Sequence, residues 1–218
     1  MIHENAARGR TVAVLVLAIL WLTLLTAPAL AAERPSLDVY RENAPKVEAF
    51  LRDYLRNNWQ LAGPHTDDLV KWIVAYSLDY DTDPLLQLSR VLHESKGRHY
   101  TLNARGEKTV LRGSSTEIGF SQVHPFWIGK TVDGMKITKE MLFDPKGNIQ
   151  AGILIYKRYD YGDYMAAITH YNNPKAKGPS PYAKEVNRLY MNMIGRFHGY
   201  KYIPTPLASA VGDSILIG

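Results

Sequence analysis

Cysteine is absent from this 218-residue sequence. No disulfide can therefore stabilise the fold, which must hold through its hydrophobic core, and a lipid-anchored cysteine is excluded. The sequence also lacks repeats, low-complexity segments and any Lys/Arg cluster dense enough to indicate nucleic-acid binding, although its formal net charge is +5. Its 46% of hydrophobic and 22% of charged residues are typical of a folded globular protein, and the length suits one domain with a small extension.

An apolar run near the N-terminus, Thr11 to Leu25, follows two arginines. It is about fifteen residues long, short of the roughly twenty that a membrane span needs. Small residues at Ala29 and Ala31 fit the cleavage site of an exported protein. We therefore predict a cleaved signal peptide over residues 1–31, and an uncleaved membrane anchor is the alternative.

Three helices are predicted before residue 96. The first begins near Pro45, the second is capped by Thr66, and the third begins at Asp83-Pro84 and ends at Ser95. In each, apolar residues recur at the spacing of one helical face: Val47, Phe50, Leu51, Tyr54 and Leu55; Leu69, Val70, Trp72, Ile73 and Tyr76; Leu85, Leu88, Val91 and Leu92.

The remaining chain predicts one β element and further helices. Tyr100–Leu102 and Thr109–Leu111 flank a polar stretch and predict a small hairpin. Helical patterns return at residues 116–123, 148–159, 164–170 and 181–197. The fold class is thus mainly α, an α+β arrangement with one small hairpin. We divide the chain into a signal peptide (1–31), an N-terminal helical segment (32–82), a helical domain (83–197) and a C-terminal tail (198–218).

Glu94 occupies the C-terminal end of the third predicted helix, just before a turn. The negative end of the helix dipole and partial burial both raise the pKa of a carboxyl there, which would keep a proton available near neutrality. General acid catalysis requires such a group. From position alone, however, a solvated glutamate at a helix end is the better interpretation.

The segments around Glu94 change this interpretation. In order they are His93-Glu94-Ser95, Gly119-Phe120-Ser121-Gln122, Leu142-Phe143-Asp144-Pro145 leading to Asn148-Ile149-Gln150-Ala151-Gly152, His170-Tyr171-Asn172, and Tyr182-Ala183-Lys184-Glu185-Val186. Their order and spacing resemble the soluble lytic transglycosylase domain (family 1 lytic transglycosylases, glycoside hydrolase family 23), which has a lysozyme-like fold. Each motif alone is weak, and the five together extend from Asp83 to about Phe197.

The resemblance implies a role for five residues. Glu94 would be the catalytic acid/base, and Ser95 would hydrogen-bond its carboxylate or the substrate. Gln122 would face the cleft near the sugar, Tyr171 would place its hydroxyl close to Glu94, and Asn172 would fix a loop or contact sugar. The alternatives are a Ser95 that only caps the helix, an exposed Gln122, and a core Tyr171 whose hydroxyl is satisfied by the backbone.

Two residues depart from the family pattern. Ser121 stands where the family has methionine, and His170 stands where the family has alanine. His170 would lie either on the outer face of its helix or near the cleft. Asp144 fits a helix cap before a proline, which leaves Glu117 as the only credible second catalytic carboxylate.

The activity implied by the resemblance is non-hydrolytic cleavage of the MurNAc-β-1,4-GlcNAc bond of peptidoglycan, which leaves 1,6-anhydroMurNAc ends. The predicted signal peptide places the protein in the periplasm. The resemblance implies an enzyme that acts on glycan strands, with the hairpin beside the cleft and no metal or organic cofactor. We expect a monomer, with cell-envelope or secretion-system proteins as possible partners. A goose-type lysozyme-like hydrolase and a non-catalytic peptidoglycan-binding protein of a secretion apparatus are the alternatives. A zinc protease is rejected, because Gly97 stands where His93-Glu94 would need a second histidine.

Overall fold

The computed structural model describes residues 34–201, so the predicted signal peptide and most of the predicted tail lie outside the described residues. The helices are α2 (Leu37–Glu42), α3 (Ala44–Trp59), α4 (Pro64–Asp79), α5 (Pro84–Ser95), α6 (Lys139–Phe143), α7 (Pro145–Lys157), α8 (Tyr164–Asn172) and α9 (Pro181–Lys201), with a 3-10 turn η1 (Pro125–Trp127). The strands are β1 (Tyr100–Leu102), β2 (Lys108–Val110), β3 (Thr131–Val132) and β4 (Met135–Lys136). Between residues 34 and 201, no helix is long and apolar enough to cross a membrane.

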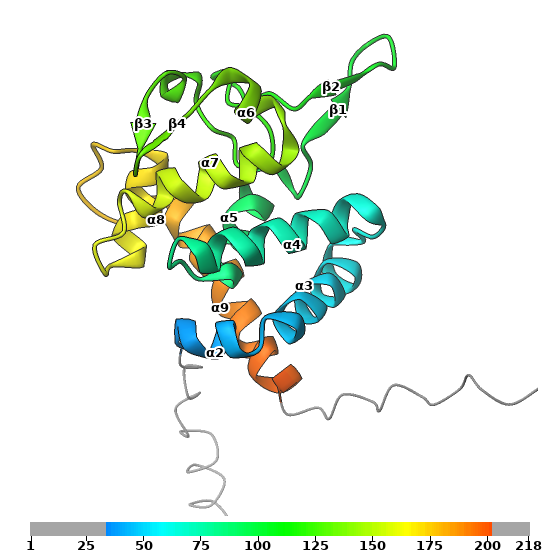
Figure 1. The fold of residues 1–218 in the computed structure, drawn as a ribbon, viewed down its shortest axis with the longest axis vertical. Helices are drawn as coiled ribbons and strands as arrows, with labels where there is room; N and C mark the ends of the chain where they lie inside the picture. Colours follow the sequence, from blue (N-terminus) through cyan, green and yellow to red (C-terminus); the bar gives the residue numbers. More distant parts are fainter. Residues whose placement is uncertain (1–33, 202–218) are drawn as a thin grey trace, which may run out of the picture. The chain divides into compact units, whose positions relative to one another are not determined.

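The predicted mainly helical class is confirmed, and the strands form two small antiparallel hairpins rather than one. β1 pairs with β2, which confirms the predicted first hairpin; its second strand begins one residue earlier than predicted, and Thr101 lies opposite Thr109. The second hairpin pairs β3 with β4, and its strands of two residues are too short to leave a sequence pattern. Figure 1 shows β3, β4 and α6 together on one side of α7.

α5 runs through the core and carries Glu94 near its C-terminal end. Asp83 caps it by accepting hydrogen bonds from the amides of Leu85 and Leu86, and Lys96 ends it in the left-handed conformation. The predicted bounds of this helix are therefore confirmed. Its residues from Pro84 to Leu92 are all buried, because α4 and α9 pack against it.

Two tyrosines of α9 join that helix to both ends of α5. The Tyr190 hydroxyl donates a hydrogen bond to Asp83 at the start of α5, and the Tyr182 hydroxyl donates to Glu94 at its end. Tyr40 of α2 also donates to Asp83, at 3.2 Å. Burial raises the pKa of Asp83. The predicted N-terminal segment thus packs on the predicted catalytic domain, since α3 also contacts α9 and α4 contacts α7.

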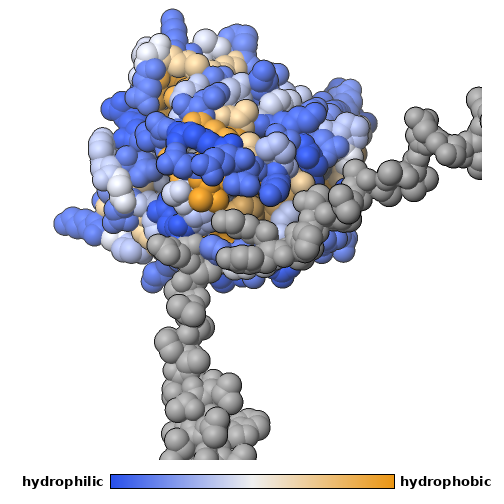
Figure 2. All heavy atoms as spheres, turned by 60° about the horizontal axis from the view of Figure 1, so that its bottom comes forward, coloured by the Kyte–Doolittle hydropathy of each residue, from blue (hydrophilic) through white to orange (hydrophobic). Residues whose placement is uncertain are grey.

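Two local predictions were wrong. α4 begins at Pro64 with Gly63 as its N-cap, so Thr66 lies inside the helix. Residues 116–123 form turns rather than a helix, because Thr116, Gly119 and Gln122 have positive φ. Their apolar side chains still reach the core through these turns. The face shown in Figure 2 is mainly hydrophilic, with apolar residues in a band that runs from its upper part down through its centre.

Candidate active site

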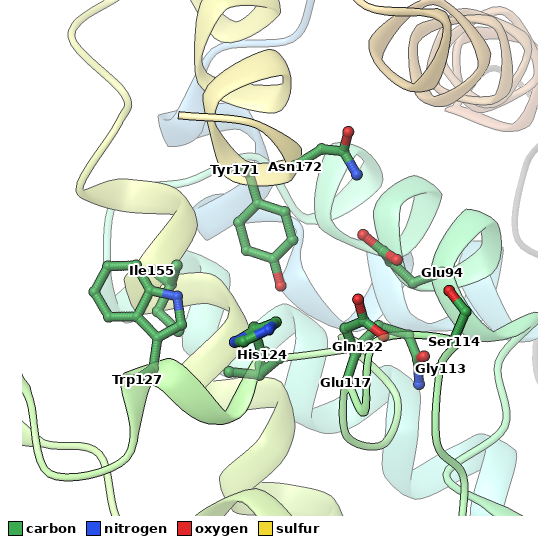
Figure 3. Close-up of a pocket in the computed structure, with 11 residues that line it drawn as sticks. Glu94, Gly113, Ser114, Glu117, Gln122, His124, Trp127, Ile155, Tyr171 and Asn172 are labelled. Atoms are coloured by element: carbon green, nitrogen blue, oxygen red, sulfur yellow. The ribbon is translucent and has the colours of Figure 1, made fainter. Parts of the chain in front are cut away.

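A pocket of about 260 Å³ lies beside the end of α5 (Figure 3). α5 contributes Glu94, α7 contributes Ile155, and α8 contributes Tyr171 and Asn172. The rest of its wall comes from the turns and η1 between α5 and β3: Gly113, Ser114, Glu117, Gln122, Val123, His124 and Trp127. The fold thus brings four of the five predicted site residues, all except Ser95, to one pocket.

Glu94 is mostly buried at the wall of this pocket, and the Tyr182 hydroxyl donates a hydrogen bond of 2.6 Å to its Oε1. Burial raises the pKa of Glu94 from its ordinary 4.5 to about 7. The Tyr182 hydrogen bond and the positive charge of Arg90 lower this pKa, and the charge of Glu117 raises it. A carboxyl with this pKa exchanges a proton readily near neutrality, as an acid/base catalyst must.

Tyr171 lies in the pocket, but its hydroxyl donates a 2.7 Å hydrogen bond to the backbone carbonyl of Ser121. Its ring packs against the guanidinium of Arg90, with the Arg90 Cζ 3.8 Å from the ring centroid. The tyrosine that hydrogen-bonds Glu94 is Tyr182 rather than Tyr171. Tyr182 belongs to the last of the five motifs, and this was the only sequence signal that pointed to it.

Ser95 is buried, and its hydroxyl donates a 3.0 Å hydrogen bond to the carbonyl of Val91 in the preceding turn. The expected hydrogen bond from Ser95 to the Glu94 carboxylate is therefore replaced by one to the backbone, and Ser95 does not line the pocket. This outcome is common for serine within a helix, because its short side chain reaches the carbonyl four residues before it.

Gln122 and Asn172 both line the pocket. The Gln122 amide donates a 2.7 Å hydrogen bond to the carbonyl of Gly119, which fixes the side chain on its own turn. Asn172 is exposed at the end of α8. His170, in the same helix, does not line the pocket, and its ring contacts the carbonyl of Ala176 at 3.3 Å.

Arg90, one helical turn before Glu94, is a fully buried cation that the sequence analysis missed. Its guanidinium bonds to the Gln87 side chain and the Gly152 carbonyl and faces the rings of Tyr171 and Tyr156. Aromatic faces and carbonyl oxygens stabilise a cation in such a place. Its i−4 spacing from Glu94 was the only sequence feature that pointed to it.

The turn between Ile118 and Ser121 is held by Asn148 of α7. The buried Asn148 side chain accepts a hydrogen bond from the Ser121 amide at 2.9 Å and donates to the carbonyls of Ile118 and Leu142. Gly152, one turn further along α7, lies so close to Ser121 that a Cβ there would overlap its hydroxyl. Ser121 therefore packs directly on α7.

His99 supports the same turn, and it lies beside Asn148 against Gly119. Its Nε2 lies 2.9 Å from the Phe143 carbonyl, and its Nδ1 accepts a hydrogen bond from the Phe120 amide. Burial lowers the pKa of His99, which favours the neutral ring that this pair of contacts needs. The turn that carries Gln122 is thus fixed by the side chains of His99 and Asn148.

Glu117 is the second carboxylate of the pocket. Its Oε2 accepts a 2.9 Å hydrogen bond from the Ser115 amide, and Gly113 lies so close that a Cβ there would overlap this oxygen. The glutamate is half-buried and lines the pocket together with Glu94. Over residues 34–201, no group of three or more His, Asp or Glu side chains is placed to hold a metal ion.

No protein-family model, curated protein or solved structure matches this chain.

Proposed function

We propose that this protein is an exported peptidoglycan lytic transglycosylase with a lysozyme-like fold. The observation that carries the proposal is Glu94, a mostly buried carboxyl at the wall of a pocket, with a pKa raised to about 7. Near neutral pH, a substantial fraction of such a group holds a proton that it can donate to a bridging sugar oxygen. The order of the five sequence motifs supports the same assignment.

In the proposed reaction, protonated Glu94 donates its proton to the glycosidic oxygen between N-acetylmuramic acid and N-acetylglucosamine, and the C1–O bond breaks. The acetamido oxygen of the muramic acid stabilises the positive charge at C1. Ionised Glu94 then removes the proton from the C6 hydroxyl, whose oxygen bonds to C1. The products are a 1,6-anhydromuramic end and a free C4 hydroxyl, and no water is consumed.

The surroundings of Glu94 suit both steps. Burial favours the protonated form that begins the reaction, while Tyr182 and Arg90 stabilise the ionised form that follows the donation. A C6 hydroxyl held beside C1 has an effective concentration on the order of 10⁵ M or more, so it competes well with water. Gln122 and Asn172, on opposite walls, would hold the sugar in this geometry.

Digestion of purified sacculi tests the proposal. Wild-type protein should release muropeptides with anhydro ends. Because no water is added, their mass by mass spectrometry is lower than that of the reducing form by one water, about 18 Da. Glu94→Gln keeps the size of the side chain but cannot donate a proton, and it should release none. Glu42→Gln, an exposed glutamate of α2, is the matched control and should retain activity. Equal release by wild type and Glu94→Gln would overturn the proposal.

A hydrolase of the goose-lysozyme type is the second candidate, and Glu117 is the observation that favours it. A hydrolase needs a carboxylate that activates water or stabilises charge besides the acid, and Glu117 lines the pocket of Glu94. If wild type produces reducing ends and Glu117→Gln does not, this candidate is favoured. Anhydro ends that persist in Glu117→Gln would favour the transglycosylase.

A non-catalytic glycan-binding role is less well supported. Binding alone does not require a buried carboxyl whose pKa is raised to about 7, because burying a charge-bearing group costs free energy. That role would be excluded if wild type cleaves sacculi while the Glu94→Gln protein binds them without cleaving them.

A further inference from the structure

A second depression, which we call the side hollow, lies next to the Glu94 pocket. Its volume is about 360 Å³, and Gly113 lines both depressions. The Glu117 and Gln122 side chains lie where a Cβ of Gly113 would stand, so the two depressions adjoin at the backbone of this residue. A group attached to a sugar in the Glu94 pocket would therefore lie beside the side hollow.

The side hollow combines an apolar floor with a basic rim. Ile118, Ile128 and Phe143 supply apolar surface, and Arg112 and Lys139 stand at the edge. The Arg112 Cζ lies 4.8 Å from the centroid of the Phe143 ring, and the Lys139 Nζ lies 5.7 Å from it. Both cations therefore lie close to the same aromatic ring.

The charge of the side hollow is not balanced by its own residues. No acidic side chain lines it. Among the ion pairs of residues 34–201, none involves Arg112 or Lys139. Glu140 follows Lys139 and interacts with its charge, but it is fully exposed and is not one of the lining residues. The Arg112 guanidinium donates one hydrogen bond, to the Thr116 carbonyl, and keeps further N–H donors for a ligand.

We propose that the side hollow binds the acidic peptide carried by the muramic acid whose glycosidic bond lies at Glu94. This inference rests on the proposed function and adds that the substrate is a peptide-bearing strand rather than a bare glycan. The peptide begins with lactyl and alanyl methyl groups, which suit the apolar floor, and it carries free carboxylates, which suit Arg112 and Lys139. Arg112 presents planar N–H donors that match a carboxylate, and Lys139 adds a second charge.

The test compares strands that carry peptides with strands stripped of peptides by an amidase. The variants are Lys139→Gln and the double variant Arg112→Gln/Lys139→Gln. The Lys139 side chain makes no hydrogen bond within the described residues, so its substitution leaves the turns around Glu117 intact. The control is Lys71→Gln/Arg158→Gln, which removes two exposed charges that line none of the three depressions.

Wild type should cleave peptide-bearing strands faster than stripped strands. The double variant should lose about threefold to tenfold in kcat/KM on peptide-bearing strands, as expected for two charge pairs at a partly exposed surface. The single variant should lose less, and neither variant should lose activity on stripped strands. The control should behave as wild type. Equal losses on both substrates, or a wild type without preference, would overturn the inference.

A binding measurement separates this inference from the proposed function. If wild type cleaves neither substrate, the proposed function fails, and calorimetry with a soluble peptide-bearing disaccharide still decides the side hollow. Weaker binding by the double variant than by the wild type and the control would uphold the inference. Equal binding by all three, or binding as tight to the peptide-free disaccharide, would overturn it.

Discussion

Replacing Glu94 by glutamine should stabilise the protein above neutral pH and leave its stability unchanged in acid. The pKa of Glu94 rises on folding from 4.5 to about 7, so the folded state resists ionisation of this carboxyl. Below pH 4.5 the carboxyl is protonated in both states and there is no penalty. The penalty grows as the pH rises and is complete above about pH 7. Glutamine never ionises, so the variant avoids the penalty.

A rise from 4.5 to about 7, at roughly 1.4 kcal/mol for each pH unit, corresponds to about 3 kcal/mol. Water in the pocket screens part of this, so we expect Glu94→Gln to increase the free energy of unfolding by about 1–3 kcal/mol at about pH 8.5 and by about zero at about pH 4. Urea unfolding at the two pH values measures both quantities. Glu42→Gln controls for the loss of one negative charge. A Glu94→Gln variant that is less stable than wild type by the same amount at both pH values would refute the reasoning.

Three further substitutions test the site. Tyr182→Phe removes the hydrogen bond that lowers the pKa of Glu94, and should raise that pKa by about one to two pH units. The alkaline limb of the pH–rate profile should therefore shift to higher pH, and an unchanged limb would contradict this. Gly113→Ala places a Cβ against the side chains of Gln122 and Glu117; because it displaces Gln122 from the sugar, it should reduce cleavage by about tenfold or more, with the fold intact by circular dichroism. Asn148→Ala leaves three buried backbone groups without their side-chain partner and should cost about 2–4 kcal/mol in urea unfolding, where a loss within error would count against the proposed support of the turn.

The predictions that succeeded depend on local chemistry. Asp83 followed by proline starts α5, and Lys96-Gly97 ends it, because capping and left-handed termination involve only neighbouring residues. The position of Glu94 followed from these bounds. The segment at 116–123 failed for the converse reason: Thr116 and Gln122 adopt positive φ without being glycine, which no local preference predicts.

The assignment of tyrosines failed because it depends on tertiary packing. Tyr171 and Tyr182 both occur in the quoted motifs, and only the position of α8 and α9 decides which hydroxyl meets Glu94. Arg90 was missed because a buried arginine without a carboxylate partner is uncommon, and its aromatic and carbonyl contacts come from α7 and α8.

Digestion of sacculi in ¹⁸O-labelled water tests most directly whether the oxygen that bonds to C1 comes from the C6 hydroxyl, deprotonated by Glu94, or from water. The account predicts wild-type products that end in the anhydro sugar, contain no label at C1, and disappear in Glu94→Gln. Reducing ends that carry the label, or unchanged products from the variant, would contradict it.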